Sequence, residues 1–348
     1  MKRKTRRGGG NKAACHDFSV IGNNANGINS KLESLEHVLK YFKGPSCVLI
    51  QETKIRGSLR KKIPGYQIFQ KPASADNSGG LMTAIRHDLS PIEQDCNVTM
   101  DILVVEVLVD NLRIRIINAY GPQEYDKKEK INDFWNELEC EVVKAKNNNR
   151  FVLIEMDANG KVGPNIIEND PNPRSNNGKL LLEMISRQKL VLLNAHSLCE
   201  GSITRYRKTI KGEEFAILDY IITCENLAAY LKRMFIDSSR SLSLTKFATL
   251  KGSRVKTVSD HNILFAAFNL QTRRVIRSER REIFDFKNRE SQEAFNKICN
   301  EKNTLSECFK GEQSPRKNPP AFLRILIISF TEPLRKLESR RGKHSIQK

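Results

Sequence analysis

The sequence around residue 260 places a carboxylate and an imidazole side by side. Residues 258–262 read Val-Ser-Asp-His-Asn and lead into an apolar run that is typical of a strand. An adjacent Asp and His at the edge of a strand can hold a divalent cation and a phosphate oxygen together. A surface Asp-His pair is more often a solvated turn, so this hypothesis depends on partners elsewhere in the chain.

Two other strand-like runs end in polar groups. Residues 48–51 are followed by Glu52, and residues 151–156 are followed by Asp157 and Asn159. Ionisable groups at strand ends can line a cleft, whereas the same groups buried inside a strand lose their hydration free energy. One such end is usually a cap or a turn, but three together favour a functional site.

A fourth polar group, Asp219, lies between apolar neighbours in the run Leu-Asp-Tyr-Ile-Ile. An acid in this setting needs a partner, and His261 is the candidate, although Asp219 could also be an ordinary satisfied buried acid. We predict that Asn24 and Asn29 are turn residues around Gly27. Tyr120, which precedes Gly-Pro, could be a core aromatic residue at a strand end.

The elements that must position these groups are mostly strand-like. Helical periodicity is present at 30–42, 127–146 and 177–188. Strand-like runs occur at 17–23, 46–51, 66–70, 80–86, 102–109, 112–119, 151–156, 190–194, 202–208, 215–222, 233–237 and 263–269. Asp110-Asn111 is a tight-turn sequence between two of these runs. Many strands with few intervening helices predict an α+β fold and not a doubly wound parallel sheet.

The charge is concentrated at the two ends of the 348-residue chain, which carries a net charge of +19. Six Lys or Arg and no acid occupy residues 1–12, and nineteen Lys or Arg against ten acids occupy 271–348. We therefore predict a basic tail at 1–16, one domain at 17–270 and a basic, partly helical extension at 271–348. Basic ends favour a polyanionic partner, with solubility or nuclear import as the alternative explanation.

Other sequence features narrow the class of protein. No run approaches the roughly 20 apolar residues that span a bilayer, and the basic start is not followed by an apolar segment. The eight cysteines are scattered without a CxxC pair, which favours reduced thiols over a disulfide frame or a zinc site. We expect no membrane partner and a location in the nucleus, with the cytoplasm as the alternative.

Six short motifs occur in order between residues 17 and 269: N-x-N-G-I-N-S, Q-E-T, N-A-Y-G-P, M-D-A-N, L-D-Y-I-I and S-D-H-N. In this order and spacing they resemble the endonuclease/exonuclease/phosphatase superfamily, and most closely the apurinic-endonuclease-type nuclease domain of non-LTR (LINE-type) retrotransposons. Craniofacial development protein-like chains share the resemblance. It implies a deoxyribonuclease-I-like, four-layer α/β sandwich of two packed mixed β-sheets flanked by helices.

The resemblance also implies a Mg²⁺ site, with Mn²⁺ as the alternative ion. Mg²⁺ prefers oxygen ligands and keeps several waters, so one or two carboxylates suffice. By resemblance Glu52 is the main ligand and Asn26 assists it. Asp260 would support either the metal or the geometry of His261.

Phosphodiester hydrolysis also needs a positioned water and donors for the charge that grows on the phosphate. By resemblance Asp157 orients or deprotonates the water, and Asn159 holds both Asp157 and a phosphate oxygen. His261 donates to the phosphate, Asp219 fixes its tautomer and charge, and Tyr120 contributes a phenol. One departure is Met156, which replaces the glycine usual before the catalytic Asp. Its larger side chain could shift Asp157 and reduce activity.

A predicted hairpin between residues 204 and 219 is closed by a Lys-Gly turn and is rich in basic groups. In the retrotransposon nucleases the corresponding hairpin lies beside the cleft and reaches the DNA. The residues predicted to contact DNA are Arg205, Tyr206, Arg207, Lys208 and Lys211, with Thr204 and Ser259 in secondary phosphate-contacting or hydrogen-bonding positions. The alternative is a solvated edge hairpin that its charges protect from aggregation.

The function that the resemblance implies is a Mg²⁺-dependent DNA endonuclease that nicks one strand of a duplex and leaves a 3′-hydroxyl, from which reverse transcription can be primed. The alternatives are an apurinic/apyrimidinic repair-type nuclease and a catalytically inactive nucleic-acid-binding remnant of a retroelement. DNA is the expected partner, without a small-molecule cofactor. Residues 271–348 resemble the linker to a polymerase, so the chain is expected to be a truncated or separately encoded part, with element RNA or a reverse transcriptase supplied elsewhere.

Overall fold

A computed structural model describes residues 15–57, 62–74, 79–93, 100–210, 212–250 and 253–273. Nearly all of the predicted basic tail and of the predicted C-terminal extension lies outside these residues, so the domain division stays a prediction. Among the described residues, Cys47, Cys140, Cys199 and Cys224 have free thiols. No helix in this part of the chain combines the length and the apolar character that crossing a bilayer requires.

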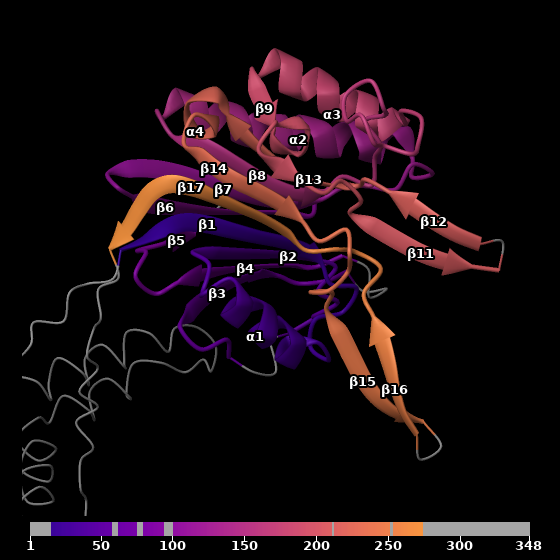
Figure 1. Cartoon of the computed structure of the whole chain (residues 1–348). Coiled ribbons are helices and arrows are strands. Elements are labelled where there is room, and N and C mark those ends of the chain that lie inside the picture. The colour runs from indigo at the N-terminus through magenta and orange to yellow at the C-terminus, as the bar shows by residue number, and fades with distance from the viewer. Residues whose placement is uncertain are drawn as a thin grey trace, which may run out of the picture. The chain divides into compact units, whose positions relative to one another are not determined.

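Two mixed β-sheets form the centre of the described structure (Figure 1). The larger sheet has seven strands in the described residues, in the order β10 (Cys199–Glu200), β14 (Leu231–Ile236), β17 (Leu264–Arg273), β1 (Cys15–Asn24), β2 (Cys47–Gln51), β4 (Leu81–Arg86) and β3 (Tyr66–Lys71). The other has six, in the order β5 (Ile92–Glu93), β6 (Ile102–Val109), β7 (Leu112–Tyr120), β8 (Phe151–Asp157), β13 (Asp219–Cys224) and β9 (Leu190–Leu192). Each sheet contains parallel and antiparallel neighbours, as predicted.

Helices cover the outer face of each sheet. They are α1 (Leu32–Tyr41) on the larger sheet, and α2 (Lys128–Asn147) and α3 (Asn176–Arg187) on the smaller one. The short α4 (Glu225–Ala228) and a 3₁₀ turn at Leu193–Ala195 instead contribute Leu227 and Leu193 to the apolar cluster between the sheets. Three apolar clusters match these layers, because one lies between the sheets and one lies under the helices on each side. The four-layer α/β sandwich is therefore confirmed.

Local sequence explains several of these elements. Asp110 and Asn111 have φ of 49° and 66°, the left-handed conformations that a two-residue turn between β6 and β7 requires. Helix α3 begins after Ser175, whose hydroxyl accepts the Gly178 N–H. One predicted strand at 215–222 is instead the end of β12 (Gly212–Ala216) and the start of β13, because Ile217 and Leu218 separate them.

Two strand pairs in the described chain extend from the sandwich on one side of Figure 1. They are the predicted hairpin of β11 (Arg205–Thr209) with β12, and a second hairpin of β15 (Thr245–Leu250) with β16 (Ser253–Val258). The second hairpin was not predicted, because its sequence lacks the apolar alternation of a half-buried strand.

A polar layer lies inside the sandwich. The Gln51 amide donates to Glu155 and, at 2.7 Å, to Asn118 Oδ1. Burial raises the pKa of Glu155 well above its usual value, which favours the protonated carboxyl. Gly22 lies against Glu155, and a Cβ at residue 22 would overlap the carboxyl group. The absence of a side chain at residue 22 makes room for this acid.

Candidate active site

A small cleft of about 150 Å³ collects polar residues from distant parts of the chain. Its lining consists of Asn24, Asn26, Glu52, Gln123, Asp157, Asn159, Arg205, Asp260 and His261. Seven of these nine were predicted site residues, and the exceptions are Asn24 and Gln123. The ends of β1, β2 and β8, together with the segment before β17, bring them together.

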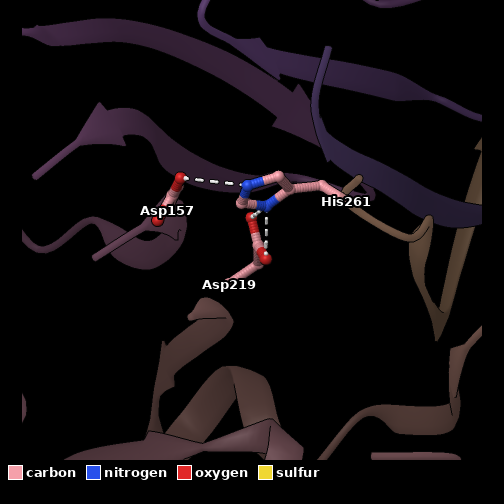
Figure 2. A group of neighbouring side chains, drawn as sticks. All are labelled: Asp157, Asp219 and His261. Atoms are coloured by element: carbon pink, nitrogen blue, oxygen red, sulfur yellow. Dashed lines mark hydrogen bonds and ion pairs between the residues drawn. The ribbon is translucent and has the colours of Figure 1, made fainter. Parts of the chain in front are cut away.

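Figure 2 shows an Asp–His pair, of which His261 lines the cleft. Asp219 is the first residue of β13, and its two carboxylate oxygens lie 3.0 and 2.9 Å from Nδ1 of His261. Asp219 is fully buried and His261 is 5% exposed. The predicted pairing of these two side chains is therefore present.

The charge state of His261 follows from this pairing. Burial alone lowers the pKa of an imidazole, but the charge and hydrogen bond of Asp219 outweigh it and raise the pKa of His261 to about 9. His261 is then an imidazolium at neutral pH, with Nδ1–H donated to Asp219. Its Nε2 lies 3.9 Å from Oδ2 of Asp157. The arrangement leaves Nε2–H as a donor toward the cleft.

Asp157 is the last residue of β8 and faces Asp219 across the sheet register. Its Oδ1 accepts the Asn159 N–H at 2.9 Å. Burial, together with the charge of Asp219, raises the pKa of Asp157 to about 7. Asp157 can therefore gain or lose a proton near neutral pH, which a general base requires. The Asn159 side chain donates to Gly121 O at 2.8 Å, so it also anchors the neighbouring loop.

The structure corrects our prediction for Asn24. We expected a turn residue, but Asn24 ends β1, is 2% exposed and donates from Nδ2 to Asp157 Oδ2 at 2.8 Å. Its position as the first asparagine of N-x-N-G was the available signal. Local sequence could not show that a residue 133 positions away would face it. Asn29 does lie in a turn, as predicted.

Met156 does not enter the cleft. It is fully buried in the apolar cluster between the smaller sheet and its helices. Successive strand residues face opposite sides of a sheet, so Asp157 points away from that cluster. The methionine is accommodated in the core while Asp157 keeps its contacts with Asn24 and Asn159.

The other side of the cleft carries the predicted metal ligands. Glu52 follows β2 with a left-handed φ of 44°, and the Tyr120 hydroxyl donates to its carboxylate. Burial, followed by the charge of Asp157, raises the pKa of Tyr120, so the phenol keeps its proton. Tyr120 was predicted to contact phosphate, and the structure places its hydroxyl on Glu52 instead.

The donor set of this side fits a hard cation. Lys54 Nζ lies 2.5 Å from Asn26 Oδ1 and 3.5 Å from Glu52 Oε2, so an ammonium group is held by both oxygens. A carboxylate and an amide oxygen that converge on one cation are ligands of the kind that Mg²⁺ accepts. Glu52 and Asn26 could therefore hold such an ion, with Lys54 displaced.

A second lysine, Lys31, supports the loop that carries Asn26. Lys31 is 5% exposed, and its ammonium donates to the carbonyl oxygens of Ala25 and, at 3.2 Å, Asn26. Burial lowers the pKa of Lys31 to about 8. Sequence reasoning missed both lysines, because each lies within an ordinary polar stretch.

Asp260, which was predicted to support either the metal or the geometry of His261, forms an ion pair with Arg205. Its Oδ2 lies 3.3 Å from Arg205 Nε. Burial alone raises the pKa of Asp260, but the charges of His261 and Arg205 outweigh it and lower the pKa. The ion pair with Arg205 supports the second predicted role of Asp260, which is to fix the segment that carries His261.

A second cation-binding arrangement is geometrically conceivable. Ligand atoms of Asp157, Asp219 and His261 lie within 4.8 Å of one another. Both oxygens of Asp219 already accept from His261 Nδ1, and a protonated imidazole repels a cation. The cluster is better suited to moving protons than to holding a metal.

The predicted DNA contacts divide into two groups. Thr204 is fully buried, and its hydroxyl accepts the N–H groups of Leu218 and Asp219. Ser259 is 2% exposed and donates to Asn24 O. Neither hydroxyl is accessible to DNA, so phosphate contact is wrong for both. The structure places them in the alternative hydrogen-bonding role, in which they hold the strands that carry the site.

The hairpin residues are more accessible. Arg207 and Lys208 are exposed on β11, opposite Glu214 and Glu213 of β12. Tyr206 donates to Glu213, and its ring contacts the ring of Phe215 edge to face. Lys211 lies outside the described residues. Arg207 and Lys208 thus remain candidates for DNA contact, whereas Tyr206 is engaged within the protein.

Solved nuclease structures share this architecture. The endonuclease domain of TRAS1, a telomere-specific non-LTR retrotransposon, has a TM-score of 0.55 at 18% identity, over 72% of this chain and 98% of that one. The fold is that of the endonuclease/exonuclease/phosphatase proteins. An endonuclease/exonuclease/phosphatase family protein from Leptotrichia buccalis has a TM-score of 0.50 at 14% identity, over 72% and 99% of the two chains.

An AP endonuclease has a similar TM-score. The AP endonuclease LMAP from Leishmania major has a TM-score of 0.56 at 14% identity, over 72% of this chain and 87% of that one. No protein-family model and no curated protein sequence matches the chain. The predicted resemblance is thus confirmed for the fold, and the activity must be argued from the cleft.

Proposed function

We propose that this protein is a divalent-metal-dependent endonuclease of the endonuclease/exonuclease/phosphatase superfamily that nicks one strand of duplex DNA and leaves a 3′-hydroxyl. The observation that carries the proposal is the convergence of Asp157, the Asp219–His261 pair and Glu52 on one cleft. Such a cleft offers a base, a cationic donor and a metal ligand, the parts that phosphodiester hydrolysis requires.

The proposed reaction assigns a task to each residue. Asp157, with its pKa near 7, takes a proton from water while the water oxygen bonds to phosphorus. The bond from phosphorus to O3′ breaks, and the leaving oxygen gains a proton to become the 3′-hydroxyl. Nε2–H of His261 donates to a phosphate oxygen as charge grows there, and Asp219 keeps the imidazole oriented and protonated.

The metal would be held by Glu52 and Asn26, with Mg²⁺ as the first choice and Mn²⁺ as the alternative. When bound, it supplies a positive charge that polarises the phosphate. Tyr120 keeps the Glu52 carboxylate in place through its hydroxyl. Asn24 and Asn159 hold the two oxygens of Asp157, which fixes the direction from which a water is deprotonated.

DNA is the proposed substrate because exposed cations stand beside the cleft. Arg207 and Lys208 of the β11–β12 hairpin could contact phosphates flanking the scissile bond. The likeness to the TRAS1 endonuclease domain supports a retrotransposon-type nicking activity. A nuclear location, and a reverse transcriptase or element RNA supplied elsewhere, accompany the proposal.

A plasmid-nicking assay tests the proposal. Wild type with Mg²⁺ should convert supercoiled plasmid to the open circle, and EDTA should abolish this conversion. Glu52→Ala and His261→Ala should be inactive, whereas His37→Ala, which changes an exposed histidine on α1, should match wild type. Absence of metal-dependent nicking by wild type would refute the enzyme and leave a nucleic-acid-binding remnant. Cleavage confined to duplexes with an abasic site would indicate a repair-type enzyme.

A further inference from the structure

One side chain outside the predicted site joins the hairpin to the catalytic segment. The guanidinium carbon of Arg240 lies 4.4 Å from the ring centroid of Tyr206, on β11. Nη2 of the same guanidinium donates to Ser259 O at 2.7 Å. Ser259 precedes His261 by two residues, so Arg240 contacts both the hairpin and the segment that places the imidazole.

These two segments already form one backbone unit. The Tyr206 N–H donates to Asp260 O at 2.7 Å, and the Asn262 N–H donates to Thr204 O at 2.7 Å. Arg205 and His261 are thereby paired in an antiparallel bridge. A tilt of the hairpin stem must consequently move the backbone of His261.

The loop that carries Arg240 is fixed independently of the hairpin. Asp237 is fully buried, and its carboxylate accepts the N–H groups of Ser241 at 3.1 Å and Leu242 at 2.6 Å. The Arg240 N–H donates to Asp237 O at 2.9 Å, and the φ of Arg240 is 62°, in the left-handed region. These hydrogen bonds fix the turn, which directs the guanidinium of Arg240 toward the junction between the hairpin and the segment that carries His261.

We propose that Arg240 is a positioning residue that fixes the β11–β12 hairpin and His261 in one relative orientation. Through this contact Arg240 sets which phosphate enters the cleft once the hairpin has bound DNA. The inference rests on the proposed function. A planar guanidinium can stack on a ring and donate in its own plane at the same time, whereas a lysine ammonium cannot hold both contacts.

The test compares Arg240→Ala and Arg240→Lys with a matched control, Arg233→Ala. Arg233 also lies over an aromatic ring, Phe235, at 5.4 Å, but it pairs with Glu200 and does not line the cleft. Arg240→Ala should lower kcat on the order of tenfold through misplacement of His261, and it should redistribute the nick positions on a long duplex. Arg240→Lys should be intermediate, and Arg233→Ala should match wild type in both measurements.

A combination with Tyr206→Leu separates positioning from general stabilisation. If Arg240 acts through Tyr206, the double variant should show nearly the same nick map and kcat as Arg240→Ala alone. A variant with lowered Tm but a wild-type nick map and a wild-type kcat per folded molecule would overturn the proposal.

Hydrogen exchange gives a readout that does not require catalysis. Arg240→Ala should speed amide exchange at Tyr206 and Asn262 at least severalfold, because their hydrogen bonds cross the junction, whereas Arg233→Ala should not. Unchanged exchange in Arg240→Ala would refute the positioning role. An inactive wild type with faster exchange in Arg240→Ala would refute the proposed nuclease and keep the positioning contact.

Discussion

The two halves of the cleft are built in opposite ways. Asp157, Asp219 and His261 are almost fully buried, with Asp219 hydrogen-bonded to His261 and Asp157 held by Asn24 and Asn159. Glu52 and Asn26 lie on loops with left-handed φ, are more accessible, and share a lysine ammonium. Groups that transfer protons benefit from fixed geometry and shifted pKa values, whereas ligands of Mg²⁺ must accommodate an ion that keeps its waters.

The largest effect should come from the buried half. Asp157→Asn preserves the size of the side chain but removes the proton acceptor, so kcat should fall on the order of 10³-fold. Added Mg²⁺ should not restore the rate. Single-turnover nicking at saturating Mg²⁺ measures this, with Asp133→Asn on the exposed face of α2 as the control. If added Mg²⁺ restored the rate of Asp157→Asn, Asp157 would act through the metal, and the two halves of the cleft would not have separate functions.

A smaller loss is expected from the accessible half. Glu52→Gln weakens the metal site, so activity at a fixed low Mg²⁺ concentration should fall on the order of 10²-fold. Because the remaining oxygens can still bind the ion, part of the activity should return as Mg²⁺ is raised. The Mg²⁺ titration of kcat is the measurement. If Glu52→Gln had the same Mg²⁺ midpoint as wild type, Glu52 would not be a metal ligand.

The pH dependence of activity tests the protonation states proposed for Asp157 and His261. Asp157 must be deprotonated to accept a proton, so activity should fall about tenfold per pH unit below its pKa of about 7. His261 must be protonated to donate, so activity should also fall above about pH 9. A plateau between these values is expected at saturating Mg²⁺ for wild type. His261→Gln should retain weak activity without the alkaline limb, and an unchanged alkaline limb would assign that limb to another group.

The smallest effect is expected at Lys54. Its ammonium competes with the metal for Asn26 and Glu52, so Lys54→Met should lower the Mg²⁺ midpoint about threefold, the scale of one partly exposed ion pair. Lys40→Met, which changes an exposed lysine on α1, should leave the midpoint unchanged. A higher midpoint in Lys54→Met would show that the lysine supports the metal site.

Sequence reasoning succeeded where the signal for a site residue lies in its immediate neighbours along the chain. The strand that ends at Asp157 and the acid flanked by apolar residues at 219 both carried signals in a few neighbouring residues. The four-layer fold was implied by the family resemblance that the six ordered motifs carry. The β6–β7 turn followed from Asp110 and Asn111, because few residues adopt positive φ without cost.

Other parts of the site depend on contacts that local sequence does not encode. Asn24 faces Asp157 only because β1 and β8 lie in different sheets that pack together. The burial of Thr204 and Ser259 likewise depends on how the hairpin stem crosses the segment before β17. Arg240 has no neighbouring apolar pattern or motif, so its two contacts are visible only in three dimensions.

The polar layer between the sheets has a consequence for how this chain can diverge. The Glu155 side chain fills the space that a Cβ at residue 22 would need, and its carboxyl group also accepts a hydrogen bond from Gln51. Alanine at 22 should be poorly tolerated alone but accepted once residue 155 has become smaller. Homologous chains should therefore show covariation between these two positions, with a historical order in which the acid is lost before the glycine is replaced.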